Sequence, residues 1–216
     1  MPNKVKGLIG NYAKEYYFDY KYLARFILIS PNLNLDGKSY DYNVGNPHYD
    51  WVVNAIDSAR SANIPWVIVG MHKNCLSIGV KSCEVGTELM DLLIEKRVDL
   101  ILQGHEHNYQ RSKQLICASA NSYKDSCVAD SGVDSSYTKG VGSILVIAGT
   151  SGRSLTDVNV SDSEAGYFVK WSGKNTSPSH GILKFTVSNK QIFYQFVSTS
   201  KGQFGDSFTI SENVPE

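Results

Sequence analysis

Three short, mostly apolar runs alternate with two amphipathic stretches through the middle of the chain. The apolar runs cover residues 66–69, 98–102 and 143–147, and such runs are typical of strands buried on both faces of a parallel sheet. Residues 87–96 repeat leucine and isoleucine at helical spacing. A second helix is predicted ahead of the first run, beginning at Pro47 and ending at Asn63-Ile64-Pro65. The alternation of strand, helix and strand predicts an α/β fold.

Both flanks of this central region have a different pattern. Residues 16–30 are rich in aromatic and β-branched side chains and predict two strands with a turn near Lys21. Residues 181–187 and 191–197 alternate apolar and polar positions around a short polar connection, which predicts a hairpin. Residues 206–210 add a last strand. A chain of 216 residues can bury one substantial core, so we expect a single domain over 1–216 that ends in antiparallel strands.

Composition excludes some classes of protein. The chain is 42% hydrophobic and 19% charged, as in ordinary globular proteins, and its 21 basic and 21 acidic side chains cancel. We therefore expect no nucleic-acid partner and no attraction to a membrane surface. No run approaches the roughly 18 apolar residues of a membrane span. The N-terminus lacks an apolar signal-peptide core, so the sequence is that of a mature or truncated chain or of a cytoplasmic protein.

The four cysteines form two short-range pairs, Cys75 with Cys83 and Cys117 with Cys127, in polar segments. This arrangement suggests two local disulfides and a secreted or extracytoplasmic protein. Four unpaired thiols are the alternative, and structural zinc is disfavoured because neither pair has the two-to-four-residue spacing of zinc ligands. The second pair opens a Ser- and Asp-rich segment, and we expect a disulfide-bracketed insertion at 117–138.

Three of the five histidines follow the carboxyl ends of predicted strands. His72 comes after residues 66–69, and His105 and His107 come after residues 98–102. Ligands bind at this edge of open α/β sheets. His105 and His107 would project to the same side of an extended segment, and Gly104 would allow a sharp turn. Converging imidazoles are good ligands for zinc, iron or manganese, so we predict a metal site.

The other two histidines have no such partners along the chain. His48 falls in the first turn of the predicted helix and is expected to be a surface residue. His180 precedes a predicted strand and is expected to cap a loop.

Two motifs carry a resemblance to a known family. Val69-Gly70-Met71-His72 resembles the V-x-x-H motif of the calcineurin-like metallophosphoesterases. Residues 104–111, which begin Gly104-His105-Glu106-His107, resemble the G-H-x-H motif as the purple acid phosphatase branch has it. The resemblance extends over nearly the whole chain. It implies the C-terminal half of a metallophosphoesterase β-sandwich flanked by helices, in the layer order α/β/β/α.

The resemblance also implies a chemistry. His72 and His105 would ligate one metal ion and His107 a second one, the pair being two of iron, zinc or manganese. In this family a bridging aspartate joins the two ions, and metal-bound water attacks the phosphorus of a phosphate ester. We assign no catalytic or substrate-binding residue beyond these ligands. Tyr109 and Arg111 are expected to pack beneath the histidine loop.

The sequence departs from the family in several places. The earlier motifs G-D-x-x-Y and G-N-H are not found, because Gly10-Asn11-Tyr12 lacks the histidine and Gly205-Asp206 lies near the wrong end. We therefore expect the sequence to begin in the middle of the domain. Three histidines without carboxylates make a poor dinuclear site, so metal occupancy and rate should fall. Lys73-Asn74-Cys75 stands where the family commonly has a proline, which predicts a remodelled loop pinned by Cys75 and Cys83.

Three functional hypotheses remain open at this point. The first is a metal-dependent phosphoric ester hydrolase domain, weak or inactive without the missing N-terminal segment. The second is a non-catalytic secreted half-domain that binds a single metal ion or a partner chain, such as its own N-terminal half or a second chain. The third is an unrelated single-zinc hydrolase that uses His72, His105 and His107.

Overall fold

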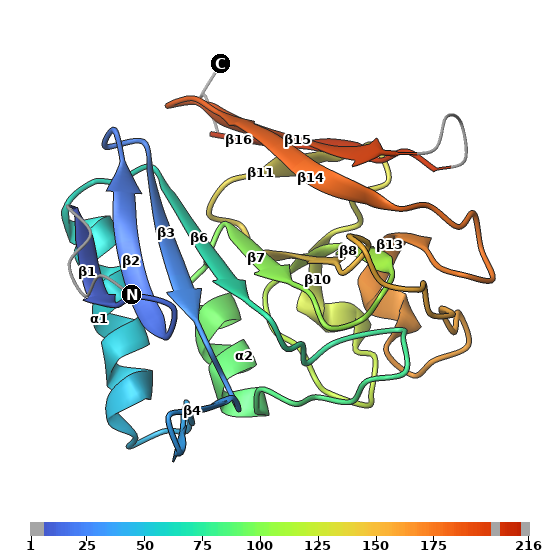
Figure 1. The fold of residues 1–216 in the computed structure, drawn as a ribbon. Helices are drawn as coiled ribbons and strands as arrows, with labels where there is room; N and C mark the ends of the chain where they lie inside the picture. The colour runs from blue at the N-terminus through green and yellow to red at the C-terminus, as the bar shows by residue number, and fades with distance from the viewer. Residues whose placement is uncertain (1–6, 200–203, 213–216) are drawn as a thin grey trace.

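A computed structural model describes residues 7–199 and 204–212, which form two main sheets and two α-helices (Figure 1). The larger sheet has eight strands in the order β1-β2-β3-β6-β7-β12-β8-β13. In that order, their bounds are Leu8–Asn11, Glu15–Tyr20, Ala24–Ile29, Trp66–Met71, Leu100–Gln103, Ile144–Ala148, Tyr109–Ser112 and Phe168–Ser172. Its four middle strands, β3, β6, β7 and β12, are parallel, and the outer strands pair antiparallel.

The smaller sheet has four strands in the order β11-β16-β15-β14. Their bounds are Ser136–Thr138, Ser207–Ser211, Gln191–Ser198 and Gly181–Val187. Two ribbons complete the β-structure: β4 (Asn34–Leu35) with β5 (Lys38–Ser39), and β9 (Gln114–Leu115) with β10 (Val128–Asp130). Short 3₁₀ turns cover Asp125–Cys127 and Ala165–Tyr167.

Both faces of the central strands are buried, as the apolar runs predicted. In β6, Val67 and Val69 pack into the core against the helices, whereas Trp66 and Ile68 pack into the core against the four-stranded sheet. All four side chains are almost completely excluded from solvent. One run therefore supplies two cores because successive side chains of a strand point to opposite faces.

The two α-helices lie on one face of the eight-stranded sheet (Figure 1). Helix α1 (Pro47–Ser61) begins at the predicted proline, and the side chain of Asn46 caps it by accepting from the backbone N–H of His48. Helix α2 is Thr87–Glu95. The four-stranded sheet covers the opposite face, so the layers are α, β and β. The predicted sandwich is confirmed; no α-helix within 7–199 and 204–212 covers the outer face of the smaller sheet.

The segment 117–138, predicted as an insertion, is built into the fold. Its disulfide joins Cys117 to Cys127. Beyond it, β10 pairs with β9, and β11 is an edge strand of the four-stranded sheet, parallel to β16. The segment therefore contributes pairing to the sandwich as well as a surface loop.

A buried ion pair joins the two sheets beneath the histidine loop. The guanidinium of Arg111, in β8, donates to the carboxylate of Asp206 through Nε at 2.7 Å and Nη2 at 3.1 Å. The hydroxyl of Tyr109 donates to the same carboxylate at 2.7 Å. These contacts give Tyr109 and Arg111 a packing role, as the sequence suggested.

Candidate metal-binding site

The structure brings the predicted histidines together at the carboxyl edge of the parallel strands. His72 directly follows β6, and the backbone N–H of Gly104, just after β7, donates to the His72 carbonyl at 3.1 Å. Nδ1 of His105 lies 3.2 Å from Nε2 of His72, and the two rings meet edge to face with centroids 4.9 Å apart. The strand ends thus place two imidazoles from distant parts of the sequence in direct contact.

His107 belongs to the same neighbourhood but makes no ring contact of this kind. Burial lowers the pKa of the His72 imidazole below its ordinary value, and nearby charge on His105, Lys73 and His107 acts in the same direction. His72 therefore favours its neutral form, which is the form that can bind a metal ion.

The loop that carries His105 and His107 is not extended, so the expectation that they project to one side for that reason was wrong. His105 has φ 65°, in the left-handed region, and the N–H of Glu106 donates to the carbonyl of Gly104 at 2.8 Å. The bend is therefore made at His105 itself. A left-handed residue other than glycine is uncommon and marks a conformation that its surroundings impose.

Two features fix the loop in this shape. Glu106 is completely buried, and its Oε1 accepts from the backbone N–H of Lys81 and from Ser77 Oγ. On the other side, a Cβ at Gly149 would overlap the carbonyl oxygen of Glu106. Gly149 follows β12. The glycine-rich turn after this strand therefore allows the backbone of the histidine loop, at Glu106, to pack directly against the backbone of Gly149.

A carboxylate that sequence reasoning missed stands beside His105. Oε1 of Glu84 lies 3.1 Å from His105 Nε2, and Oε2 lies 3.0 Å from the ammonium of Lys73. Partial burial would raise the pKa of the Glu84 carboxyl, but hydrogen bonds from Lys73 and His105 outweigh burial and lower that pKa. Glu84 is 21 residues from His105 along the chain, and only the adjacent Cys83 marks it in the sequence.

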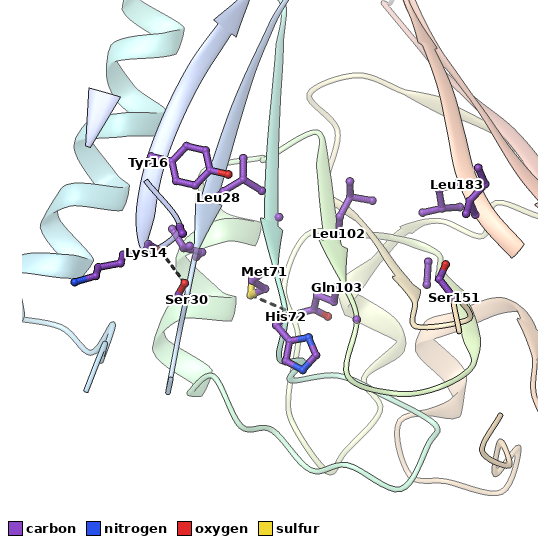
Figure 2. Close-up of a pocket in the computed structure, with 16 residues that line it drawn as sticks. Lys14, Tyr16, Leu28, Ser30, Met71, His72, Leu102, Gln103, Ser151 and Leu183 are labelled. Atoms are coloured by element: carbon purple, nitrogen blue, oxygen red, sulfur yellow. Dashed lines mark hydrogen bonds between the residues drawn. The ribbon is translucent and has the colours of Figure 1, made fainter. Parts of the chain in front are cut away.

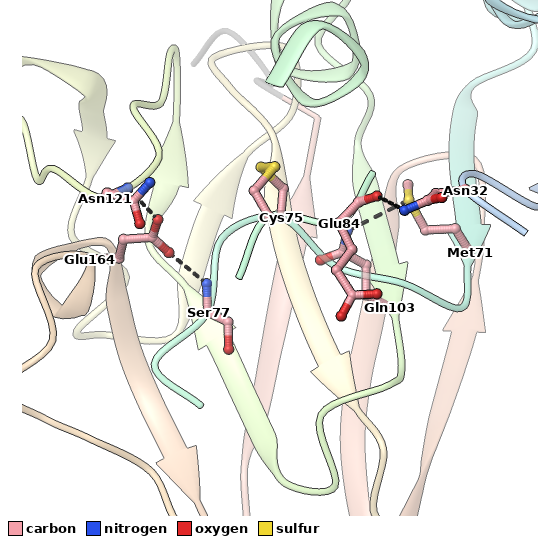
Figure 3. Close-up of a disulfide and its surroundings, with 9 residues drawn as sticks. Asn32, Met71, Cys75, Ser77, Glu84, Gln103, Asn121 and Glu164 are labelled. Atoms are coloured by element: carbon pink, nitrogen blue, oxygen red, sulfur yellow. Dashed lines mark hydrogen bonds between the residues drawn. A yellow bond between two sulfur atoms is a disulfide. The ribbon is translucent and has the colours of Figure 1, made fainter. Parts of the chain in front are cut away.

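The loop after His72 is pinned as predicted. Cys75 and Cys83 form a disulfide, Cys117 and Cys127 form the second, and no described cysteine is free. Figure 3 shows Glu84 beside Cys75 and the hydrogen bond between Glu84 and Asn32. Both predicted disulfides are therefore confirmed.

An open cleft of about 530 Å³ adjoins His72 at the sheet edge (Figure 2). Its walls come from β2, β3, β6 and β7 on one side and from β14 on the other, with Tyr16, Leu28 and Leu183 among the apolar lining residues. Gln103 also lines the cleft, and its buried Oε1 has no hydrogen-bond partner in the described part of the chain.

His48 is not the isolated surface residue that the sequence suggested. Its Nδ1–H donates to the buried carboxylate of Glu15, with both oxygens at 2.8 Å, and its ring stacks on Tyr40. Tyr42 donates to the same carboxylate at 3.2 Å. This cluster ties helix α1 to strand β2. His180 is exposed and its Nε2–H donates to the carbonyl of Arg153 at 3.0 Å, which fits the predicted loop contact.

The histidine pair fits part of a metal site. Two nitrogen ligands of one tetrahedral zinc ion are separated by about 3.3 Å when each bond is near 2.0–2.1 Å, close to the 3.2 Å between His72 and His105. A carboxylate that accepts a hydrogen bond from the other ring nitrogen of a ligating histidine is also usual. However, no group of three or more His, Cys, Asp or Glu side chains in the described ranges is arranged to hold a metal ion. The residues present fit two ligand positions and do not complete a dinuclear centre.

Comparison with known proteins shows what this chain is similar to. The chain is 27% identical to a nucleotide pyrophosphatase/phosphodiesterase of Hordeum vulgare over 183 residues, 79% of this chain. It is 24% identical to a protein of Arabidopsis thaliana named probable inactive purple acid phosphatase 1, over 81% of this chain. The structure of a purple acid phosphatase from seeds of yellow lupin, Lupinus luteus, matches 92% of the chain with a TM-score of 0.69 at 22% identity. The chain is purple acid phosphatase-like.

The purple acid phosphatase-like chain spans less than half the length of these relatives: 45% of the barley protein, 28% of the Arabidopsis protein and 32% of the lupin chain. It matches the C-terminal part of the domain. Other Arabidopsis relatives are named probable inactive purple acid phosphatases 24 and 27, and another is named an Fe(3+)-Zn(2+) purple acid phosphatase. No family model matches the sequence. No helix of the described ranges is long and apolar enough to cross a membrane.

Proposed function

We propose that the chain is a phosphoric ester hydrolase-type domain in which Nε2 of His72 and Nδ1 of His105 bind one divalent metal ion, and His107 contributes to a second. The observation that carries the proposal is the pair of facing ring nitrogens 3.2 Å apart at the sheet edge. The similarity to purple acid phosphatases supports it. An ion held there would polarise a phosphate ester and activate water.

The residues of this chain account for binding of a metal ion better than for hydrolysis of a phosphate ester. Burial lowers the pKa of His72 and so favours the neutral imidazole that a metal ion binds, and the adjoining cleft of about 530 Å³ has the size of a small-molecule site. The 216 residues lack the aspartate motifs that would bridge two ions, and some relatives are named inactive. We therefore propose that this chain alone binds metal but hydrolyses esters weakly or not at all.

Zinc binding to the purified chain tests this proposal. In isothermal titration calorimetry, His72→Ala and His105→Ala should each weaken zinc binding by more than about 100-fold, since a lost ligand costs at least as much as a lost outer partner. His180→Ala removes an exposed histidine whose ring donates to the Arg153 carbonyl, away from the histidine pair, and should leave the affinity unchanged.

Equal zinc affinity in wild type and both site variants would contradict the proposal. Hydrolysis of a chromogenic phosphate ester with added iron, zinc or manganese should be weak. Robust turnover that His105→Ala abolishes would support the site and overturn the proposed lack of activity.

The free edge of β14 favours a second candidate function, binding of a partner chain. β14 pairs with β15 on one side only, and no described strand pairs with its other edge. Its inward side chains, such as Leu183 and Phe185, are only partly buried, whereas Ile192 and Tyr194 of β15 are fully buried. Such an edge can accept an extended strand from another chain. The simplest such chain is a second copy of this one.

Sedimentation velocity distinguishes this candidate. It predicts concentration-dependent dimers that Leu183→Lys disrupts, because the charge would enter the apolar cleft beside the paired edge. Lys184→Ala, on the outward face of the same strand, should leave the dimer intact. A monomer at all concentrations would exclude pairing between copies.

The two disulfides also bear on location. Disulfides persist in oxidising compartments, and both cysteine pairs of the chain are joined. We propose that the protein works outside the cytoplasm.

A further inference from the structure

The geometry points to Glu84 as a positioning residue, held in place by the Cys75–Cys83 disulfide, that fixes which nitrogen of His105 is free to bind a metal ion. This inference rests on the proposed function, in which His105 is a ligand. It adds two features to the site. The first is a residue, Glu84, that lies outside both histidine motifs, and the second is the Cys75–Cys83 loop, which departs from the family pattern.

The hydrogen-bond partners of His105 determine its tautomer. A carboxylate can only accept, so the 3.1 Å contact with Glu84 Oε1 places a proton on His105 Nε2. A neutral imidazole carries one N–H, so Nδ1 keeps its lone pair. That lone pair faces His72 Nε2 at 3.2 Å. Glu84 thereby selects the one tautomer of His105 that can donate an electron pair at the sheet edge.

Glu84 acts behind His105 and does not take the place of a ligand. Both of its carboxylate oxygens are engaged, Oε1 by His105 and Oε2 by Lys73 at 3.0 Å. In the described ranges no three His, Cys, Asp or Glu side chains are arranged to hold an ion, and this includes Glu84, His72 and His105. A carboxylate in this position orients the imidazole and raises its basicity.

Hydrogen bonds from two different segments hold the Glu84 backbone in place. Its N–H donates to the carbonyl of Asn74 at 2.9 Å, and its carbonyl accepts from Asn32 Nδ2 at 2.9 Å. Asn74 and Glu84 are the residues that immediately flank the Cys75–Cys83 bridge on the outside. The bridge therefore closes the loop next to the residue pair that anchors Glu84; Figure 3 shows Glu84 beside Cys75.

Ring-nitrogen NMR of the metal-free, ¹⁵N-labelled chain tests the tautomer directly. At about pH 8.5, well above the ordinary imidazole pKa, His105 should be the Nε2–H tautomer in the wild type. Glu84→Ala should give a mixture of the two tautomers. Glu84→Gln retains an acceptor oxygen and should preserve most of the Nε2–H form. Glu95→Gln, an exposed change on α2, is the matched control and should have no effect.

Cobalt binding, followed by its visible absorption, supplies the second readout. Glu84→Ala should weaken Co²⁺ binding by about 10–100-fold, the usual effect of losing an outer partner of a ligating histidine. Glu84→Gln should lose less. Cys75→Ser/Cys83→Ser should weaken binding although every side chain named as a ligand or as its orienting partner is still present. A purely structural Glu84 would not shift the His105 tautomer.

The outcomes separate the two proposals. If the wild type binds no Co²⁺, the proposed function fails, while the tautomer measurement still decides the role of Glu84. If the wild type binds Co²⁺ and Glu84→Ala changes neither affinity nor tautomer, the positioning role is overturned and the proposed function stands. Should Glu84→Ala not fold, the Cys75→Ser/Cys83→Ser variant decides instead: releasing Glu84 should give a mixture of the two His105 tautomers, and an unchanged Nε2–H tautomer would overturn the positioning role.

Discussion

Replacing Asp206 by alanine should lower the free energy of unfolding by about 3–5 kcal/mol, the usual cost of removing one partner of a buried ion pair. Asp206 and Arg111 have side chains that are each about 1% exposed, and they form a two-point contact. The substitution leaves the guanidinium buried without its counter-charge. It also removes the acceptor of the Tyr109 hydroxyl. Urea denaturation followed by circular dichroism measures the change.

An exposed ion pair provides the control for this prediction. Lys96 lies 2.8 Å from Asp57, whose side chain is 50% exposed. Asp57→Asn should change stability by less than about 1 kcal/mol because solvent screens the pair. A similar small change for Asp206→Ala would show that the Arg111 ion pair does not hold the two sheets together.

Trp66→Ala should also cost about 3–5 kcal/mol, as large-to-small changes of buried aromatic residues do. Trp66 is the largest of the fully buried side chains and belongs to the core between the two sheets. Its indole N–H donates at 2.6 Å to the carbonyl of Ser188, in the turn between β14 and β15. The variant therefore loses packing and a hydrogen bond that anchors the smaller sheet.

Trp66→Phe separates the two contributions. Phenylalanine keeps much of the buried volume but cannot donate to Ser188, so we expect a loss well below that of alanine. Chemical denaturation of both variants gives the comparison. Equal losses for the two substitutions would mean that the hydrogen bond, rather than filled volume, decides the stability at this position.

The central elements of the fold could be predicted because their signals are local. Short apolar runs marked β6, β7 and β12, and Pro47 marked the start of α1. The turn near Lys21 is confirmed: Lys21 and Tyr22 have φ 48° and 54° between β2 and β3, as a tight hairpin requires. The 188–190 connection between β14 and β15 was equally clear.

Other strands could not be predicted from such patterns. β8 has the sequence Tyr-Gln-Arg-Ser and is completely buried. Its polar side chains are buried because they form hydrogen bonds with groups distant in the sequence, and the strand shows no alternation of apolar and polar residues. β1 is a short, mostly exposed edge strand with little hydrophobic signal. The residue that pairs with Arg111 lies 95 positions away, so no window along the sequence could connect them.

The sequence by itself determined the α/β class, the two disulfides and the approach of His72 to His105, since motif spacing and strand order place the ends of parallel neighbours at one edge. The tertiary structure decided the rest of the site. It put Glu84 behind His105, bent the loop at His105 and turned His48 onto Glu15. These features depend on contacts between segments far apart in the chain, and such contacts exist only after the sheets and the disulfide loop have packed.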